Sequence, residues 1–184
     1  MGSVETDYDW PALLRSCHAG ALTSHLRRHP LPEVALRRAA SEPAAGEPYG
    51  RAPVWRDDVG EVLLVKWRED VYCAPHDHGE ASGFVQLLAG RFVERLWRWR
   101  AGELVVANET QHDAPTILRV GAHGIHDMKA VGGGLGIHFY LPAITGMKVF
   151  DRARRETLVV RDDCGAWIPA PEGDTGLVVS RAPF

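Results

Sequence analysis

The spacing of hydrophobic positions changes partway along the chain. In the N-terminal part, apolar side chains recur every three or four residues, which is the period of an amphipathic helix. This spacing predicts one helix over residues 10–29, with Asp9 as its N-cap and a stop before Pro30. A second, shorter helix is predicted over residues 32–40, where a proline suits the first turn.

A stretch rich in proline and glycine at residues 41–53 is predicted to be a loop. Beyond it, apolar side chains recur at every second residue, which is the period of a β-strand. Short β-branched and aromatic runs follow, separated by Gly, Pro, Asp and Asn and with no helical pattern between them. The predicted strands are residues 61–67, 84–88, 91–99, 104–106, 116–120, 135–141 and 157–160. This order predicts a mainly β fold, a barrel or jelly roll with N-terminal helices.

The chain of 184 residues is long enough for one packed domain and short for two. Within that single domain we expect a helical segment packed on the barrel at residues 1–45 and the barrel itself at residues 46–162. The remainder, residues 163–184, is rich in proline and glycine and is predicted to be an irregular tail.

Composition and charge argue against several classes of protein. A net charge of −3 provides no general basic field for nucleic acid, so the alternating Arg and Trp of residues 95–100 are interpreted as a half-solvated strand. The three cysteines, Cys17, Cys73 and Cys164, share no close spacing, which predicts neither disulfides nor a CxxC metal knuckle. With no signal peptide and no apolar run of about 18 residues, we expect a soluble, cytoplasmic protein.

The strongest chemical signal is the triplet His76-Asp77-His78. On a β-strand, residues two apart face the same side, so both imidazoles would point at one place and Asp77 away from it. Imidazole is the commonest protein ligand for divalent transition metals, and a third histidine would complete one face of a coordination sphere. The alternative is a pair of histidines on an ordinary solvated strand.

Several downstream histidines are candidates for the third ligand: His123, His126 and His138, with His112 at a greater distance. The alternation that follows a turn at Gly121 favours His126 and makes His123 a solvated turn residue. Carboxylates or carbonyls should orient the ligands from behind, although the sequence does not name them.

The run from His76 to Gly90 has the spacing H-x-H-x4-G-x6-G, which resembles the first motif of the cupin superfamily. The run from Gly121 to His126 resembles the second cupin motif, whose glycine-rich turn delivers one histidine. In the first motif the position of Gly83 is usually a glutamate ligand, and here it is glycine. The resemblance implies a cupin-type β-barrel.

Over a longer stretch, from about Tyr49 to Asp151, the chain resembles the cysteine dioxygenase family of thiol dioxygenases. No single piece is specific, but their order and spacing together are. The matching pieces are Tyr49-Gly-Arg51, Trp67, His76-Asp-His78, Gly-Ile-His126 and Ile137-His138-Phe-Tyr140-Leu-Pro142.

This resemblance implies a role for each matching residue. The three motif histidines would bind one ferrous ion per chain, and Arg51, with Tyr49 beside it, would pair with the carboxylate of the substrate. His138, Tyr140 and Trp67 would lie around the metal and take part in catalysis.

Some positions depart from the animal members of that family. Gly83 stands where they carry the cysteine that crosslinks to the tyrosine matching Tyr140, so no Cys–Tyr thioether is expected. Gly136 stands where a serine would orient the histidine matching His138, and Ala130 replaces an asparagine four positions after the third ligand.

The residues and the resemblance together predict an Fe(II)-dependent thiol dioxygenase that adds both atoms of O2 to the sulfur of a small carboxylate-bearing thiol, giving a sulfinate. L-Cysteine is the leading substrate, and 3-mercaptopropionate or another thiol acid is the alternative within this class. A non-redox metal cupin, either an isomerase or a small-ligand binding protein, is the alternative outside it. The expected partners are a small thiol and O2, with neither nucleic acid nor a membrane.

Overall fold

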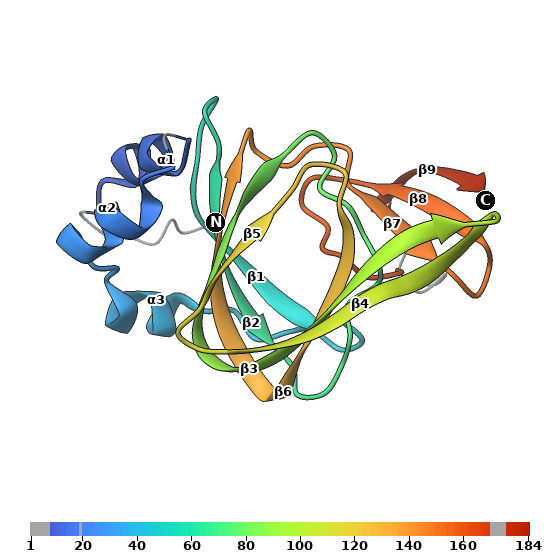
Figure 1. Cartoon of the computed structure of the whole chain (residues 1–184), viewed down its shortest axis with the longest axis horizontal. Coiled ribbons are helices and arrows are strands. Elements are labelled where there is room, and N and C mark those ends of the chain that lie inside the picture. Colours follow the sequence, from blue (N-terminus) through green and yellow to red (C-terminus); the bar gives the residue numbers. More distant parts are fainter. Residues whose placement is uncertain (1–7, 19, 170–175) are drawn as a thin grey trace.

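The computed structural model describes residues 8–18, 20–169 and 176–184. Its strands are β1 (Tyr49–Arg56), β2 (Glu61–Trp67), β3 (Ser82–Arg100), β4 (Glu103–Asp113), β5 (Ile117–Val120), β6 (Ile125–Leu141), β7 (Lys148–Asp151), β8 (Glu156–Val160) and β9 (Val178–Pro183). A six-stranded sheet has the order β1-β2-β6-β3-β4, with β5 also paired to β3, and a three-stranded sheet has the order β7-β8-β9. The large sheet curves into a barrel, with the helices at one side and the small sheet at the other (Figure 1). The prediction of a mainly β fold with N-terminal helices is confirmed.

The two long strands β3 and β6 organise the large sheet, because they pair along most of their lengths. The sequence predicted two strands at residues 84–88 and 91–99, separated at the glycine between them, but the structure shows one continuous strand. The register shifts on both sides of Ala89 as β3 passes through this point, and Gly90 has a φ of 99°. A glycine inside a strand therefore marks an irregularity here and not a chain reversal.

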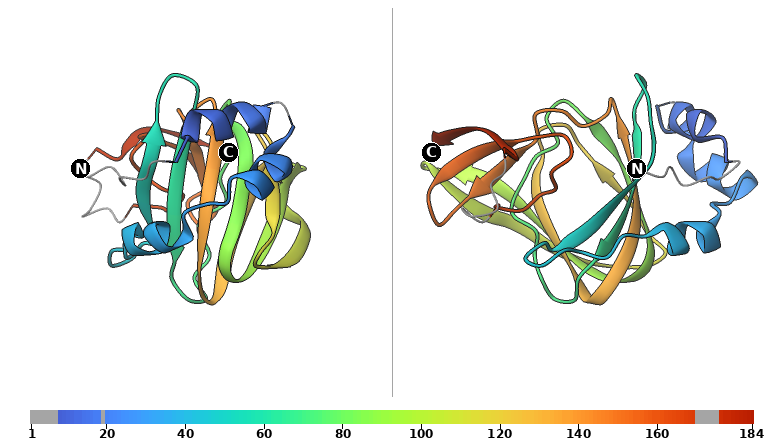
Figure 2. Two further views of the ribbon diagram at one scale, coloured as in Figure 1. Left: turned by 90° about the vertical axis from the view of Figure 1, so that its left-hand side faces the viewer. Right: turned by 180° about the vertical axis from the view of Figure 1, so that it is seen from behind.

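The helices α1 (Trp10–His18), α2 (Leu22–Arg28) and α3 (Glu33–Ala39) lie across the outer face of the large sheet (Figure 2). Asp9 caps α1 as predicted, since its Oδ1 accepts the backbone N–H of Ala12 at 2.8 Å. The prediction of one helix over residues 10–29 is wrong in its continuity. Gly20 has a φ of 70°, and the N–H of Ala21 closes the end of α1 on the carbonyl of Ser16 at 2.7 Å.

Strand β2 shows why the sheet has two cores. Its side chains are buried on both faces, as its continuous apolar sequence requires. One set, which includes Val62 and Leu64, packs against the helices. The alternate set, which includes Leu63, Val65 and Trp67, faces the inside of the barrel. The barrel interior is where the predicted site residues gather.

Several strands were not predicted from the sequence pattern. The stretch at residues 41–53 was predicted to be a loop, yet β1 begins inside it, and Pro53 lies beside a register shift. Strand β7 was not predicted either, and the supposedly irregular tail contains β9, which pairs with β8. The expectations for residues 1–7 and for residues 170–175 lie outside the described part of the chain.

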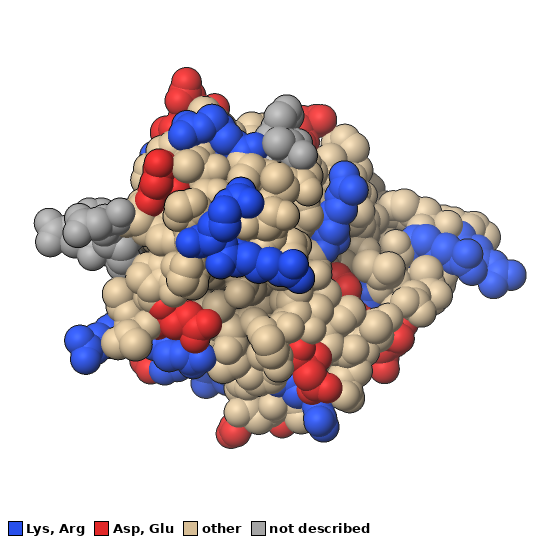
Figure 3. All heavy atoms as spheres, turned by 60° about the vertical axis from the view of Figure 1, so that its left-hand side comes forward, with Lys and Arg blue, Asp and Glu red and all other residues tan. Residues whose placement is uncertain are grey.

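No helix in the described ranges is long and apolar enough to cross a membrane. On the face that carries the helices, Lys and Arg side chains are spread in separate groups with Asp and Glu between them (Figure 3). This face therefore carries no continuous basic field.

Candidate metal centre and substrate pocket

Three histidines meet inside the barrel. His76 and His78 come from the segment between β2 and β3, and His126 is the second residue of β6. Their ring centroids lie 4.9, 4.7 and 5.1 Å apart, and one nitrogen of each lies within 4.8 Å of the others. All three are buried. A group of this geometry could hold a single metal ion.

The local backbone around the pair differs from the strand that the sequence interpretation assumed. The segment is irregular, and an isolated bridge ties it to β6: the N–H of His76 donates to the carbonyl of His126 at 2.9 Å, and the reverse bond is 3.0 Å. Asp77 points elsewhere, because its Oδ1 accepts the N–H of Lys148 at 3.0 Å. The imidazoles of His76 and His78 converge and Asp77 points away from them, as expected, although the segment is not a regular strand and is bridged to β6 at His76 alone.

The hydrogen bonds made by the Nδ1 atoms determine which ring nitrogens are available to a metal. Nδ1 of His76 lies 3.0 Å from the carbonyl of Ala74, and Nδ1 of His126 lies 2.8 Å from Oε1 of Glu94. Both acceptors require a proton on Nδ1, which leaves Nε2 as a lone-pair donor. Burial, reinforced by the neighbouring imidazoles, lowers the pKa of His76 and His78 well below the usual value. Neutral imidazole is the form that binds a metal.

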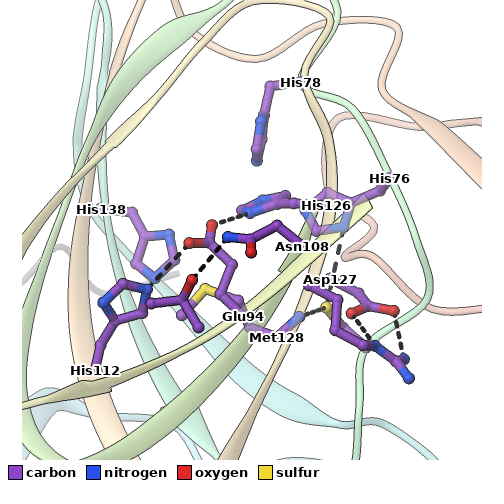
Figure 4. A network of polar contacts seen from close by, with 12 residues as sticks. His76, His78, Glu94, Asn108, His112, His126, Asp127, Met128 and His138 are labelled. Atoms are coloured by element: carbon purple, nitrogen blue, oxygen red, sulfur yellow. Dashed lines mark hydrogen bonds and ion pairs between the residues drawn. The ribbon is translucent and has the colours of Figure 1, made fainter. Parts of the chain in front are cut away.

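Glu94, on β3, is a site residue that the sequence analysis missed. Its Oε1 meets His126, and its Oε2 lies 3.2 Å from Nε2 of His112 on β4 (Figure 4). Burial raises the pKa of the Glu94 carboxyl, but the hydrogen bonds and charge interactions with both histidines outweigh it and lower the pKa. His112, one of the candidate ligands, therefore does not join the histidine group and contacts it only through Glu94.

The other two candidates also lie outside the group. His123 lies in the turn before β6 with a φ of 59°, and its side chain is 59% exposed, as predicted for a solvated turn residue. His138, on β6, is inside the barrel, but its Nδ1 is 2.9 Å from the hydroxyl of Tyr140. That hydroxyl lies 3.4 Å from Nε2 of His78, so the His138–Tyr140 pair borders the metal-binding nitrogens.

The far side of His138 has no protein partner. Its Nε2 is buried without a hydrogen bond from any described residue, and a Cβ built on Gly136 would lie 3.4 Å from it. Burial, with smaller contributions from His126 and Arg51, lowers the pKa of His138 to about 3. Burial likewise raises the pKa of Tyr140 far above its usual value. Both side chains are therefore neutral at physiological pH.

A cavity of about 40 Å³ opens on these residues and is lined by Arg51, Tyr49 and Trp67 as well as by the histidines. Arg51 lies on β1, and its Nη1 donates to the carbonyls of Cys164 at 2.6 Å and Asp162 at 3.2 Å. These bonds attach the segment that follows β8 to the pocket as one of its walls.

Tyr49 and Trp67 form a second wall of the pocket. Their ring centroids are 4.7 Å apart, and the hydroxyl of Tyr49 accepts the N–H of Ala166 at 2.6 Å. The aromatic ring of Tyr49 thus faces the cavity while its hydroxyl holds the segment that follows β8.

The chain matches a known protein family over more than half of its length. The family model described as cysteine dioxygenase type I matches residues 54–153. The chain belongs to the cysteine dioxygenase type I family. This confirms the resemblance read from the sequence motifs.

Solved structures agree with a cupin-like barrel for this cysteine dioxygenase family member. One is an uncharacterized conserved protein with a double-stranded beta-helix domain from Klebsiella pneumoniae subsp. pneumoniae MGH 78578, with a TM-score of 0.52 and 15% identity over 62% of this chain and 87% of that one. Another is KdgF from Halomonas sp., with a TM-score of 0.45 and 17% identity over 55% of this chain and 87% of that one. At 15% identity the likeness to the first of these structures shows the fold alone, and the predicted cupin-type barrel is confirmed.

The cysteine dioxygenase match contains the three histidines and the His138–Tyr140 pair, but it begins after Tyr49 and Arg51. The placement of these two residues therefore rests on the structure, where β1 carries them to the same cavity as the histidines.

Proposed function

We propose that this protein is an Fe(II)-dependent thiol dioxygenase that converts a small carboxylate-bearing thiol into its sulfinate, with L-cysteine as the leading substrate. The observation that carries the proposal is the shared cavity: three buried histidines and Arg51 line one small space. Membership of the cysteine dioxygenase family supports the same reaction.

The proposed reaction balances without a further reductant. Conversion of R–SH to R–SO2H removes four electrons from sulfur, and O2 accepts four electrons when both of its atoms enter the product. When held by the three histidines, a ferrous ion supplies the redox chemistry, because three imidazoles leave coordination positions for a thiolate and for O2.

Arg51 is the residue that we assign to the carboxylate of the substrate. Its hydrogen bonds to described residues use Nη1, which leaves the other donors of the planar guanidinium for a bidentate partner. A cavity of about 40 Å³ also limits the substrate to a small molecule, since one water needs about 10–15 Å³ by the same measure.

Tyr140 is the residue that we assign to a hydrogen bond with the reacting group. Its raised pKa keeps the hydroxyl protonated, and its oxygen can accept the Nδ1–H of His138 while its own proton points to the pocket. The thiol of Cys164, which lines the same cavity, does not compete as a charged sulfur, because burial raises its pKa to about 11.

The testing experiment is O2 uptake by the Fe(II)-loaded protein with cysteine, 3-mercaptopropionate and cysteamine, with product mass as a second measurement. We expect one O2 consumed per thiol, and a product heavier by two oxygen atoms, for the carboxylate-bearing thiols. Faster turnover of 3-mercaptopropionate would change the substrate and keep the class. If the iron-loaded protein consumed O2 with none of these thiols, a non-redox metal cupin would replace the proposal.

A further inference from the structure

A carboxylate on strand β3 joins two histidines from the two strands on either side of it, β6 and β4. Glu94 on β3 meets His126 on β6 through one oxygen and His112 on β4 through the other, at 2.8 and 3.2 Å (Figure 4). We propose that Glu94 is a positioning residue for the metal centre, which fixes and strengthens His126 as a ligand, and that His112 acts on the metal through Glu94. The inference rests on the proposed function only in taking His126 as a ligand.

The strand register places these three side chains on one face of the sheet. On one side of β3, Leu96 lies opposite His126, and on the other side Phe92 lies opposite His112. Glu94 lies between Phe92 and Leu96 along β3, and alternate residues of a strand share a face. The carboxylate is therefore diagonal to both imidazoles, a position that long side chains bridge across a sheet.

The carboxylate distinguishes His126 from the other two candidate ligands. His76 has a neutral backbone carbonyl behind it, and Nδ1 of His78 is buried with no partner among the described residues. A carboxylate acceptor holds the proton on Nδ1, fixes the ring orientation and raises the basicity of Nε2. His126 is therefore the ligand that the protein holds most firmly.

His112 completes this arrangement from the outer side. The side chains of Glu94, His126 and His112 are only 15%, 8% and 17% exposed, so water screens these contacts weakly. With a partner on each oxygen, the plane of the carboxylate is fixed, and rotation away from His126 would break the contact with His112. Since His112 does not reach the histidine group, any effect on the metal passes through Glu94.

A double-mutant cycle separates this role from a purely structural link between β3 and β4. The variants are Glu94→Gln, His112→Gln and the double variant, and the measurement is the affinity of the apo-protein for Co(II) and for Fe(II) in competition with a chelator. We expect Glu94→Gln to weaken metal binding by roughly 10- to 100-fold and to shift the visible spectrum of bound Co(II). His112→Gln should weaken binding less, and should add nothing in the Glu94→Gln background.

The matched control is His123→Gln, which removes an exposed histidine that is also paired with a glutamate, Glu80, at 3.4 Å. It should bind both metals as the wild type does. Wild-type metal affinity in Glu94→Gln would overturn the proposal, and so would an equal effect of His112→Gln in both backgrounds.

Folding is checked by thermal unfolding of each apo-protein, and if Glu94→Gln does not fold, Glu94→Asp replaces it because the shorter carboxylate does not reach both histidines. No thiol is present in these measurements. The positioning role can therefore fail while the dioxygenase activity stands, and the reverse also holds.

Discussion

The two polar networks beside the histidine group differ in how completely they are bonded. On one side, both oxygens of Glu94 have imidazole partners, and His126 is held from behind. On the other side, Tyr140 bonds one nitrogen of His138, while the other nitrogen is buried without a partner among the described residues. A buried polar atom left unpaired costs about 1–3 kcal/mol.

The difference divides the site into two sides. The Glu94–His126 side holds the metal ligand in place, and the His138–Tyr140 side is open to the reacting group. The bonded network suits a group that must keep its orientation, because both oxygens of Glu94 and Nδ1 of His126 already have partners. The Tyr140–His138 pair faces the cavity and retains capacity for a new hydrogen bond. Bound substrate would meet that capacity from the pocket, which Arg51 also lines.

The largest effect that we predict comes from removing a metal-binding histidine. Alanine at His76, His78 or His126 should abolish both metal content and thiol oxidation, because the remaining pair no longer completes one face of a coordination sphere. Metal analysis and O2 uptake check this. His123→Ala is the control and should keep its iron, and retention of iron by His126→Ala together with loss in His138→Ala would reverse the ligand assignment.

The next largest effect is expected at Arg51. Truncation of one partner in a buried charge pair costs about 2–5 kcal/mol, so Arg51→Ala should raise the apparent KM for cysteine by roughly 30-fold or more. Steady-state kinetics with cysteine and with cysteamine measure this, since cysteamine lacks the carboxylate.

The cysteamine comparison matters because Arg51 also holds the wall formed by Asp162 and Cys164. Cysteamine turnover should be poor in the wild type and hardly change in Arg51→Ala. If Arg51→Ala lost activity equally with both thiols, Arg51 would only hold the segment of Asp162 and Cys164 and would not bind the carboxylate. Arg51→Lys should restore the positive charge but not the bidentate geometry.

A smaller effect is predicted for the stability of the metal-free protein. Burial lowers the folded-state pKa of His76, His78 and His138, in the last case to about 3, whereas the unfolded value is about 6.5. Below about pH 6.5 the unfolded chain therefore binds more protons, so stability is full above that pH and falls as the pH drops.

Each such histidine contributes a slope of up to about 1.4 kcal/mol per pH unit. Urea unfolding of the apo-protein between about pH 7.5 and about pH 5.5 measures the slope. His138→Gln should reduce this slope by up to about 1.4 kcal/mol per pH unit at the acid end of the range, and an unchanged slope would mean that His138 is not neutral in the folded state.

The parts of the fold that follow from local pattern were predictable. The strand β2, the capped start of α1 and the barrel class all follow from apolar spacing and capping residues. The break at Gly20 and the continuity of β3 through Gly90 were not, because a glycine with positive φ can either end an element or bend one. The choice depends on what packs against it, which is a property of the folded chain.

The same limit applies to the site. The motif spacing identified His76, His78 and His126, and the structure brings these three together. Glu94 and the true position of His112 were missed because they depend on the register of β3 with its two neighbours. A register is set by side chains far apart in the sequence, so a charged residue in an alternating strand gives no local sign of its partner.

A still smaller effect is expected if Nε2 of His138 is given a hydrogen-bond partner. Gly136→Ser would place a hydroxyl beside Nε2 of His138, and a new hydrogen bond contributes about 0.5–1.5 kcal/mol net. The matched variant Gly136→Ala adds the same Cβ without the hydroxyl. We expect the serine variant to be more stable than the alanine variant by that amount in urea unfolding, and equal stabilities would show that His138 gains nothing from this position.

The last prediction is that the covalent state of Tyr140 does not change during turnover. The tyrosine lies opposite Gly83 across β3 and β6, so the partner position offers no sulfur for a thioether. The position also has no room for one, because a Cβ on Gly83 would collide with the carbonyl oxygen of Phe139 and lie 3.1 Å from Cδ1 of Tyr140. The intact mass of the iron-loaded protein after turnover should equal the sequence mass, and a loss of two hydrogens that maps to a peptide pair containing Tyr140 and Cys73 or Cys164 would contradict this.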